Sequence, residues 1–342
     1  MEVKGMRFDK DKKNAIVLYI LEKINENVDG VSRHVSEELN VNQSTVHRYI
    51  NELLDNNVIE KEKHGKYRLV THVGQYQLSR AEGDLESDMI PFNQCLLPHI
   101  SHLSLNVQQI WTYVFSEMIN NVMDHSEATK AIIKVTQDYL NTTVILIDNG
   151  VGVFKKIQDH FGYSSIDDSI IELFKGKLTT DSVNHSGEGI FFSSRMMDRF
   201  YIISSKKIFT CNQFDDETVY DLAERTPEGT CILMSLSNYS AKNLQDIFDK
   251  YADVNGGFTK TIIPMKNIFD SPPVSRSQAK RLSNRLDRFV EVDLDFSGIS
   301  WMGQGFAHQL FVVFQAEHPN IKINPVYMDE KVSRMYMHVI NG

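Results

Sequence analysis

Between residues 117 and 236 the chain carries four short polar or glycine-rich segments in a fixed order, and its fold must accommodate all four. The first segment belongs to a stretch predicted to be helical, which runs to His125. Glu117, Asn121 and His125 fall at i, i+4 and i+8 of that helix. They therefore share one helix face, where a carboxylate, an amide and an imidazole point toward a single ligand.

The other three segments lie at the ends of predicted strands and helices. A strand over 142–147 ends in Asp148-Asn149-Gly150-Val151-Gly152, and its two glycines suit a turn that brings backbone close to a flat ligand. His185-Ser186-Gly187-Glu188-Gly189-Ile190 opens an apolar helix over 191–200, whose first N–H groups and positive dipole end suit phosphate oxygens. Gly229-Thr230 precedes a strand over 231–236.

Each segment alone occurs by chance in many loops, so the argument depends on the order and spacing of the four. Together they resemble the N, G1, G2 and G3 boxes of the GHKL (histidine-kinase-like) ATPase superfamily, over residues 117–236. The resemblance implies a Bergerat-fold α/β sandwich that binds ATP and Mg²⁺. The short length of this single ATPase module is closer to that of the anti-sigma-factor kinases than to that of ATPases with large transducer domains. Anti-sigma-factor kinases phosphorylate a serine on a STAS-type partner.

The resemblance assigns four residues to the phosphate end of the nucleotide. Asn121 would bind the Mg²⁺ that bridges the triphosphate. Glu117 would be the general base that orients water or a protein hydroxyl for attack on the γ-phosphate. Gly187 and Gly189 would hold the phosphates at the start of the apolar helix.

It assigns four more residues to the adenine end. Asp148 would accept a hydrogen bond from the adenine amino group, although the same residue in isolation is an ordinary turn carboxylate. Gly150 and Gly152 would shape the adenine pocket. Thr230 would contact the adenine side, directly or through water.

Two further residues have alternative interpretations. Lys177 belongs to the segment 174–181, an expected mobile ATP lid, where it either reaches phosphate or is only exposed to solvent. His125 resembles the histidine of anti-sigma-factor kinases, but a solvated helix C-terminus also favours a histidine.

Neither His102 nor His125 has the sequence context of a phospho-accepting histidine, so histidine autophosphorylation is not expected. A structural zinc site is discarded because no HxxxH or CxxC spacing supports it.

The N-terminal segment, residues 1–72, is predicted to contain three helices over 14–25, 31–39 and 45–56. Two short strands over 58–61 and 67–70 flank Lys63-His64-Gly65-Lys66, a plausible wing. The segment resembles winged-helix transcription regulators.

DNA contacts would come from the third helix and the wing. The candidates are Asn42, Gln43, Ser44, Thr45, His47, Arg48, Lys63, Lys66 and Arg68. Residues 1–72 hold 12 Lys and Arg against 12 Asp and Glu, so the segment has no net charge. Because that balance is unusual for a DNA-binding segment, dimerisation or protein docking stays open as the alternative role.

The C-terminal segment alternates strands over 258–263, 290–296 and 321–327 with helices over 275–289, 303–316 and 329–339, which predicts a small parallel or mixed sheet. The stretch 292–307 resembles the strand-turn-helix of STAS anti-sigma-factor antagonists and the STAS-like domains of unknown function found beside such ATPases. The usual phosphoacceptor position holds Gln304 and Gly305. Ser297 and Ser300 lie close by in sequence and are the alternative acceptors, while a docking or dimerisation surface is the simpler role.

Composition narrows the class of protein. A net charge of −9 over 342 residues argues against a whole-molecule electrostatic grip on nucleic acid. Three cysteines without a CxxC pair fit a reducing cytosol. No stretch reaches the roughly 20 apolar residues of a membrane span, so a cytoplasmic protein without membrane contact is expected.

The sequence thus predicts an α+β multidomain protein: a winged helix over 1–72, a polar linker over 71–88 that runs into an ATPase domain over 80–238, and a STAS-like domain over 241–342. The leading hypothesis is an ATP-dependent transcription regulator or signalling switch that hydrolyses ATP slowly. The alternative is a serine/threonine kinase acting on a separate partner. A homodimer is expected, because GHKL proteins often dimerise and winged helices commonly work in pairs on DNA.

Overall fold

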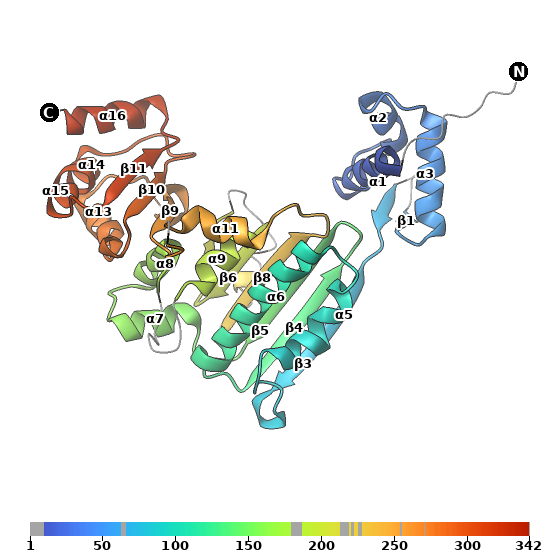
Figure 1. The fold of residues 1–342 in the computed structure, drawn as a ribbon, viewed down its shortest axis with the longest axis horizontal. Helices are drawn as coiled ribbons and strands as arrows, with labels where there is room; N and C mark the ends of the chain where they lie inside the picture. The colour runs from blue at the N-terminus through green and yellow to red at the C-terminus, as the bar shows by residue number, and fades with distance from the viewer. Residues whose placement is uncertain are drawn as a thin grey trace, which may run out of the picture. The chain divides into compact units, whose positions relative to one another are not determined.

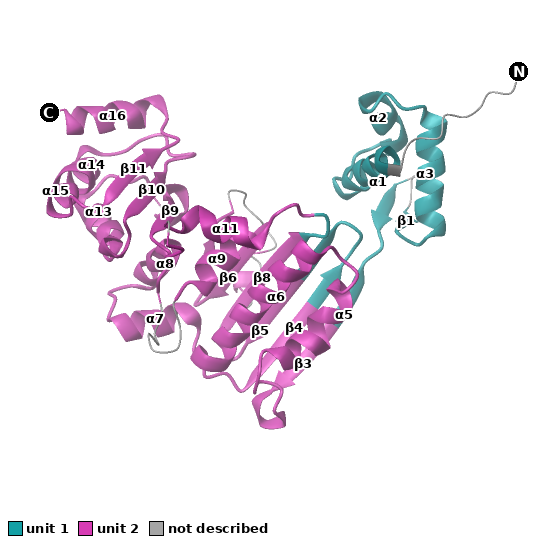
Figure 2. Ribbon diagram, in the orientation of Figure 1, with its two compact units in different colours: residues 1–74, 135–143, 237–239 teal, residues 75–134, 144–236, 240–342 magenta. Residues whose placement is uncertain are grey.

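The computed structural model describes residues 10–62, 66–178, 187–212, 219, 222–224, 228–253, 255–269 and 271–341. The chain divides into two compact units (Figure 2). Unit 1 comprises Met1–Gly74, Val135–Thr143 and Ser237–Tyr239, and unit 2 comprises Gln75–Lys134, Val144–Leu236 and Ser240–Gly342. No helix in the described ranges is long and apolar enough to cross a membrane.

Unit 1 contains a three-helix cluster and a two-stranded hairpin. The helices are α1 (Lys10–Asn25), α2 (Val31–Glu38) and α3 (Gln43–Asp55), and the antiparallel strands are β1 (Ile59–Lys61) and β2 (Tyr67–Leu69). Asn42 caps α3 by accepting a hydrogen bond from the Ser44 N–H. The buried apolar faces form one core, which also includes Leu140 from the 135–143 segment. The helices and strands agree with the predicted ones to within a few residues.

A six-stranded sheet organises the middle of the chain (Figure 1). Its strands in spatial order are β3 (His72–Ser79), β4 (Lys130–Gln137), β5 (Asn141–Asp148), β8 (Thr230–Ser237), β6 (Arg199–Ser204) and β7 (Lys207–Thr210). β6 is antiparallel to both of its neighbours, β7 and β8.

The first strand of this sheet corrects a prediction. The segment 71–88 was expected to be a polar linker, yet His72–Ser79 forms strand β3 at the edge of the sheet. Within β3 only Leu78 is buried. An edge strand leaves one side unpaired and tolerates polar side chains, so the alternation of apolar residues that marks a strand is absent here.

Helices cover one face of the sheet (Figure 1). They are α5 (Leu97–Ile100), α6 (Leu105–Asn120), α9 (Gly189–Met196) and α11 (Leu244–Tyr251), with α4 (Met89–Pro91) and a π-helical turn, Phe92–Leu96, before α5. α6 buries Trp111 and Phe115 completely in this layer. Its C-terminus continues into a second π-helical turn, Asn121–His125. After β5 the chain forms α7 (Val153–Phe161) and α8 (Ile166–Lys175).

The C-terminal part of unit 2 is a three-stranded sheet with helices. The strands β9 (Lys260–Pro264), β10 (Glu291–Asp295) and β11 (Lys322–Val326) are parallel, with β10 in the centre. The helical segments are α12 (Met265–Ile268), α13 (Arg276–Ser283), the 3₁₀ turn Leu286–Arg288, α14 (Gln304–His308), the π-helical turn Gln309–Phe314, α15 (Gln315–Glu317) and α16 (Glu330–Ile340).

One predicted helix in this part is shorter than expected. The helix predicted over 275–289 ends at Ser283, because Arg285 adopts a left-handed backbone conformation with φ 60°. The chain then continues into the 3₁₀ turn. The mixed helix and strand content agrees with the predicted α+β class.

Candidate functional site

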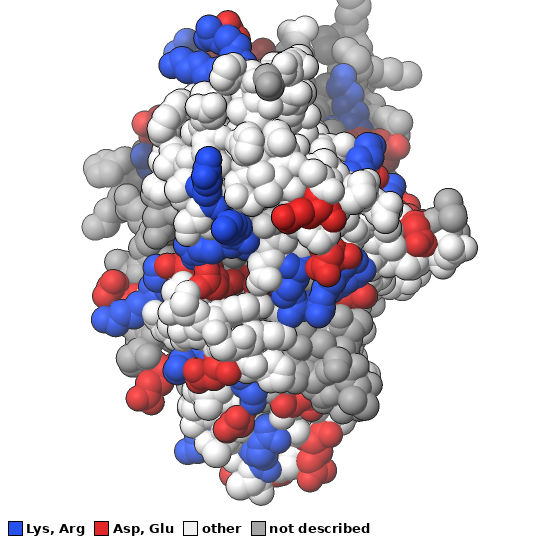
Figure 3. All heavy atoms as spheres, turned by 90° about the vertical axis from the view of Figure 1, so that its left-hand side faces the viewer, with Lys and Arg blue, Asp and Glu red and all other residues white. Residues whose placement is uncertain are grey.

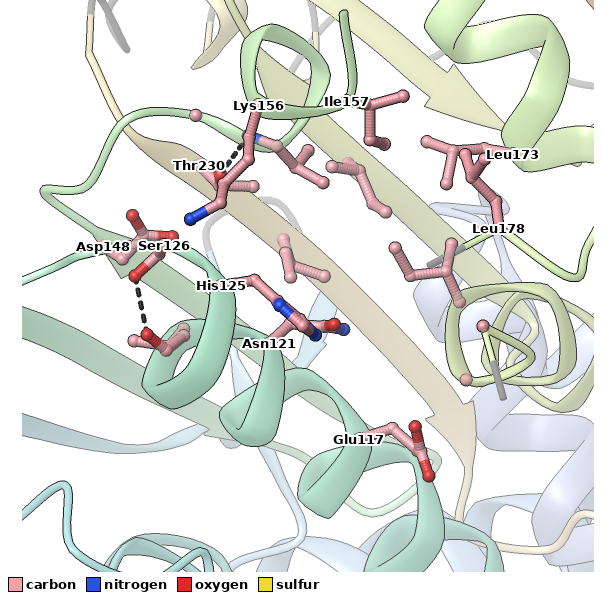
Figure 4. A pocket seen from close by; sticks show the side chains of 18 residues that line it. Glu117, Asn121, His125, Ser126, Asp148, Lys156, Ile157, Leu173, Leu178 and Thr230 are labelled. Carbon is pink, nitrogen blue, oxygen red and sulfur yellow. Dashed lines mark hydrogen bonds between the residues drawn. The ribbon is translucent and has the colours of Figure 1, made fainter. Parts of the chain in front are cut away.

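A cavity of about 240 Å³ lies in unit 2, walled by the end of α6, the end of β5, and parts of α7, α8, α9, β6 and β8 (Figure 4). Its lining residues are Glu117, Asn121, Val122, His125, Ser126, Asp148, Gly152, Val153, Lys156, Ile157, Leu173, Leu178, Gly187, Gly189, Ile190, Ile202, Thr230 and Ile232. Segments more than 100 residues apart in sequence thus form one site.

Asp148 gives one side of the cavity a buried carboxylate. The residue is 4% exposed, and its Oδ1 accepts a hydrogen bond from the Gly150 N–H at 2.7 Å. Burial raises the pKa of Asp148, and hydrogen bonds from Gly150 and Thr230 oppose that rise. A desolvated acceptor is costly to keep, and a donor on a ligand would lower that cost.

The turn beside Asp148 depends on a glycine that does not itself line the cavity. Gly229 has φ +77°, and a Cβ there would collide with the carbonyl oxygen of Asp148. Glycine therefore lets β8 begin directly against the end of β5. The next residue, Thr230, accepts a hydrogen bond from the Val153 N–H at 3.1 Å, which fixes the start of α7 at the same point.

Apolar side chains make up another part of the cavity wall. Ile157, Leu173, Ile202 and Ile232 contribute aliphatic wall surface. Figure 4 shows Asp148 and Glu117 apart from each other, with Asn121 and His125 between them and Ile157 and Leu173 on another side of the cavity. An apolar slot with a few fixed polar groups is the usual composition of a small-molecule site.

The predicted polar face of α6 does point into the cavity. Glu117, Asn121 and His125 all line it (Figure 4). Asn121 and His125 lie in the π-helical turn that follows α6. Such turns occur often at functional sites, because they change the direction in which successive side chains project.

The start of α9 forms the wall next to Glu117. Gly187, Gly189 and Ile190 line the cavity there. A Cβ on Gly189 would meet the Glu117 carboxylate, so a larger residue there would require the Glu117 side chain to move. The first N–H groups of a helix carry a partial positive charge, which favours anionic groups at this place.

Two residues of the predicted nucleotide site do not line the cavity. Gly150 lies behind it, where a Cβ would meet the backbone of Ser126. Lys177, one of whose two predicted roles was to reach phosphate, donates a hydrogen bond from Nζ to the Arg288 carbonyl at 2.9 Å. In this conformation the Lys177 ammonium is directed at the C-terminal part of the chain. His185 and the residues 179–181 lie outside the described part of the chain.

The site contains a cationic side chain that was not predicted from the sequence. Lys156 on α7 lines the cavity, and its Nζ lies 2.9 Å from Oε1 of Glu127. Lys156 follows Gly152 by four residues, so a helix that starts at Gly152 would bring it back over the glycine turn. The four-residue spacing between Gly152 and Lys156 could therefore have predicted Lys156 as a site residue.

In unit 1, α3 and the β1–β2 hairpin carry the other predicted contacts. Gln43, Ser44, His47 and Arg48 are exposed, as predicted, and Thr45 is half-buried. The Ser44 hydroxyl donates to Oδ1 of Asn42 at 2.9 Å, so it serves the helix cap. Lys63 lies outside the described residues.

Each described cation among the predicted phosphate contacts already has an acidic neighbour. Lys66 lies 2.9 Å from Asp29, and Arg68 lies 2.8 Å from Glu60 and 3.6 Å from Glu62. The Arg48 guanidinium is 3.9 Å from Glu52 and lies over the Tyr49 ring. Ion pairs of this exposed kind are weak, so a polyanion can displace them, but they lower the positive potential of the face.

The loop after β10 holds the predicted serines. Ser297 is half-buried and its N–H donates to Oδ1 of Asp295 at 2.8 Å, while Ser300 and the neighbouring Trp301 are exposed. Gln304 occupies the first position of α14, with its side chain exposed.

Comparison with known protein families covers the two ends of the chain. Residues 10–83 match a winged helix-turn-helix family, and residues 278–333 match a STAS-like domain of unknown function. The predicted winged helix and STAS-like domain are thereby confirmed. Neither match extends into residues 84–277. No curated protein matches the chain.

Proposed function

We propose that the middle of the chain is an ATP-binding module of the GHKL type with a Bergerat sandwich, and that the protein is an ATP-dependent transcription regulator or signalling switch. The observation that carries the proposal is the buried Asp148 acceptor on one side of an apolar cavity, with Glu117, Asn121 and the start of α9 on the other. That arrangement matches a ligand with a flat donor-bearing base and an anionic tail.

The fit to an adenine base rests on Asp148 and its surroundings. A buried carboxylate with room for a further donor suits an exocyclic amino group, and the aliphatic wall suits the faces of a purine ring. A guanine base presents a carbonyl acceptor in place of that amino group, which would face the carboxylate without a donor. The same residues therefore favour adenine.

The fit to Mg²⁺ and phosphate rests on Asn121, Glu117 and α9. Asn121 offers a hard carbonyl oxygen, a ligand type that Mg²⁺ prefers together with phosphate oxygens. Mg²⁺ would neutralise charge on the triphosphate. Glu117 would orient a water molecule or a protein hydroxyl, and the N–H groups at the start of α9 would donate hydrogen bonds to phosphate oxygens.

The winged helix supports the regulatory half of the proposal. A helix-turn-helix with an exposed third helix commonly enters the major groove, and here Gln43, His47 and Arg48 are exposed on α3. The two family matches flank the proposed nucleotide module. ATP binding would therefore affect two flanking domains: a winged helix that contacts DNA and a STAS-like domain that offers a surface for a protein partner.

The test is binding of a fluorescent ATP analogue with Mg²⁺ to the wild type, Asp148→Asn and Asn121→Ala, with phosphate release followed on the same samples. We expect wild-type binding that both substitutions weaken by about tenfold or more. DNA affinity is then compared without nucleotide, with ADP and with a non-hydrolysable ATP analogue. No nucleotide binding by the folded wild type would refute the proposal.

The phosphate measurement also separates the two reaction classes. Slow release of free phosphate fits the switch. Transfer of a radiolabelled γ-phosphate to a protein hydroxyl would instead identify a serine/threonine kinase, which Glu117 serves equally well. Identical DNA affinity in every nucleotide state would remove the link between the two activities.

A further inference from the structure

The end of α8 is buried against the STAS-like domain by a charged network inside unit 2. Lys175 is 1% exposed, and its Nζ lies 2.6 Å from Oε1 of Glu172 and donates to the Asn284 carbonyl at 2.5 Å. The Thr261 hydroxyl on β9 donates to the Lys175 carbonyl at 2.8 Å. An ammonium this deeply buried is retained only when its partners satisfy it, so the end of α8 has one defined position.

Two arginines of the STAS-like domain extend this network to Lys177, two residues beyond Lys175. Arg285 Nε lies 3.4 Å from Oε2 of Glu172, and Arg285 Nη2 donates to the Lys177 carbonyl at 3.1 Å. Arg288 Nη1 donates to the same carbonyl at 3.2 Å, while the Arg288 carbonyl accepts from Lys177 Nζ. Lys177 is thus bound through both its backbone and its side chain.

The bound segment has an unusual backbone. Gly176 has φ 85° and Lys177 has φ 56°, two consecutive residues in the left-handed region. A lysine rarely adopts this conformation, and it persists where surrounding bonds enforce it. Here the enforcing bonds come from Arg285 and Arg288.

The segment leads directly into the cavity. Leu178, the next residue, lines the cavity, and its N–H donates to the carbonyl of Gly187, which also lines the cavity, at 3.1 Å. One peptide bond therefore separates the carbonyl held by the two arginines from a wall of the candidate site.

The exposed surface around the contact between Gly176–Leu178 and the two arginines carries charges of both signs. Arg281 pairs with Asp168 across it, and Lys207 pairs with Asp167 nearby. On the face turned to the viewer in Figure 3, Lys and Arg side chains lie beside Asp and Glu side chains, without one continuous basic field. A surface of such mixed charge offers little electrostatic attraction to a polyanion.

We propose that the STAS-like domain regulates the nucleotide site by holding Gly176–Leu178 through Arg285 and Arg288, so that nucleotide binding and the state of α13 and the following turn depend on each other. This inference rests on the proposed function. Arg285 and Arg288 are positioning residues, because they act on the cavity through Lys177 and touch no ligand. Coupling of this kind is reciprocal by thermodynamic necessity, and typical values change affinity by about 5- to 150-fold.

The first test measures nucleotide affinity in the full-length chain. Arg285→Ala and Arg288→Ala are compared with the wild type and with Arg276→Ala, which removes an exposed arginine from α13. We expect the affinity for the fluorescent ATP analogue to fall about fivefold or more in the first two variants and to stay unchanged in the third. Arg288 is exposed, so Arg288→Ala keeps the test valid where Arg285→Ala disturbs folding.

The second test reads the coupling in the opposite direction. Hydrogen exchange of the amides in α13 and Leu286–Arg288 is measured with and without the analogue. We expect slower exchange with nucleotide in the wild type and in Arg276→Ala, and a loss of that response in Arg288→Ala. A merely structural role of Arg288 would change the basal exchange and leave the nucleotide response intact.

The outcomes separate this inference from the proposed function. Wild-type binding with the same affinity in Arg288→Ala, and no nucleotide response in the α13 amides, would overturn the coupling and leave the nucleotide site standing. No binding by the wild type would overturn both. Weaker binding in Arg276→Ala to the same extent would also count against the coupling, because it would show a general effect of removing positive charge.

Discussion

The cavity in unit 2 and the surface of unit 1 formed by α3 and the β1–β2 hairpin place their charged groups in different environments. In the cavity, the Asp148 carboxyl group is buried, and the loss of water around it raises its pKa because it disfavours the charged form. On unit 1, Arg48, Lys66 and Arg68 are exposed and lie beside carboxylates of the same domain. The first arrangement costs stability and favours a specific donor, whereas the second costs little and moderates attraction to polyanions.

This difference indicates how far each region is prepared for its ligand. A buried acceptor in a preformed wall has already lost its water, so a matching ligand gains the full hydrogen bond. A surface arginine with a carboxylate neighbour must first exchange partners. Substitutions in the cavity are therefore expected to have large effects and substitutions on unit 1 small ones.

The largest effect is expected from Gly229→Ala. Its Cβ would meet the Asp148 carbonyl oxygen, and φ +77° is unfavourable for alanine. We expect the free energy of unfolding to fall by about 3 kcal/mol in denaturant titrations. Gly162→Ala is the matched control, because Gly162 also has a positive φ, +67°, but has nothing within 4 Å of its Cβ position. That control should cost about 1 kcal/mol, and equal losses in the two variants would show that the β5–β8 junction is not tightly packed.

The second effect is expected from Asp148→Asn, which should weaken binding of the ATP analogue by about 10- to 100-fold. Asp159→Asn, at an exposed carboxylate of α7 that pairs with Lys155, is the control and should leave binding unchanged. Fluorescence titration measures both. Retained affinity in Asp148→Asn would mean that the buried carboxylate does not contact the base.

The pH dependence of stability tests the same carboxylate. The folded-state pKa of Asp148 is raised by burial, so its favourable contribution to folding is present below the unfolded-state pKa and is lost as the pH rises through the folded-state pKa. Asp148→Asn should therefore melt at a higher temperature than the wild type at neutral pH. The difference in melting temperature should shrink as the pH is lowered into the acidic range. A lower melting temperature at neutral pH would contradict this account of the site.

The smallest effect concerns unit 1. Replacing Glu60 and Glu62 by glutamine frees Arg68 from its acidic neighbours, and we expect affinity for duplex DNA to rise about two- to fivefold at moderate salt. Fluorescence anisotropy over a salt series measures this gain. Glu37→Gln, which frees Arg33 on α2, is the control and should have less effect. An unchanged affinity would favour a docking role for this winged helix.

Local patterns predicted much of the fold and part of the candidate site. The i, i+4, i+8 spacing predicted one shared face for Glu117, Asn121 and His125, and all three line the cavity, although the last two lie in a π-helical turn and not in a regular α-helix. Strand β3 was missed because an edge strand with one buried residue lacks apolar alternation. Periodicity finds elements that bury a whole face, and β3 does not.

The placement of Lys177 shows what local patterns cannot reach. Its sequence neighbours gave no sign of Arg288, which is 111 residues away and accepts its hydrogen bond. Lys156 was within reach of a local argument, since it follows the glycine turn by one helical turn. Long-range contacts between domains depend on the relative packing of two folded parts, and that packing leaves no periodic trace in either segment.

In the π-helical turn Asn121–His125, the number of residues in the turn matters to the site as well as their identity. A π turn holds one residue more than an α-helical turn, as if a single residue had been inserted into the end of α6. Deleting one residue there would allow an ordinary α-helix to continue and would rotate every following side chain. His125 could then no longer keep its present direction relative to Glu117 and Asn121, although none of the three residues had been replaced. The amino acid spacing in this turn is therefore as restrictive as the identity of its side chains.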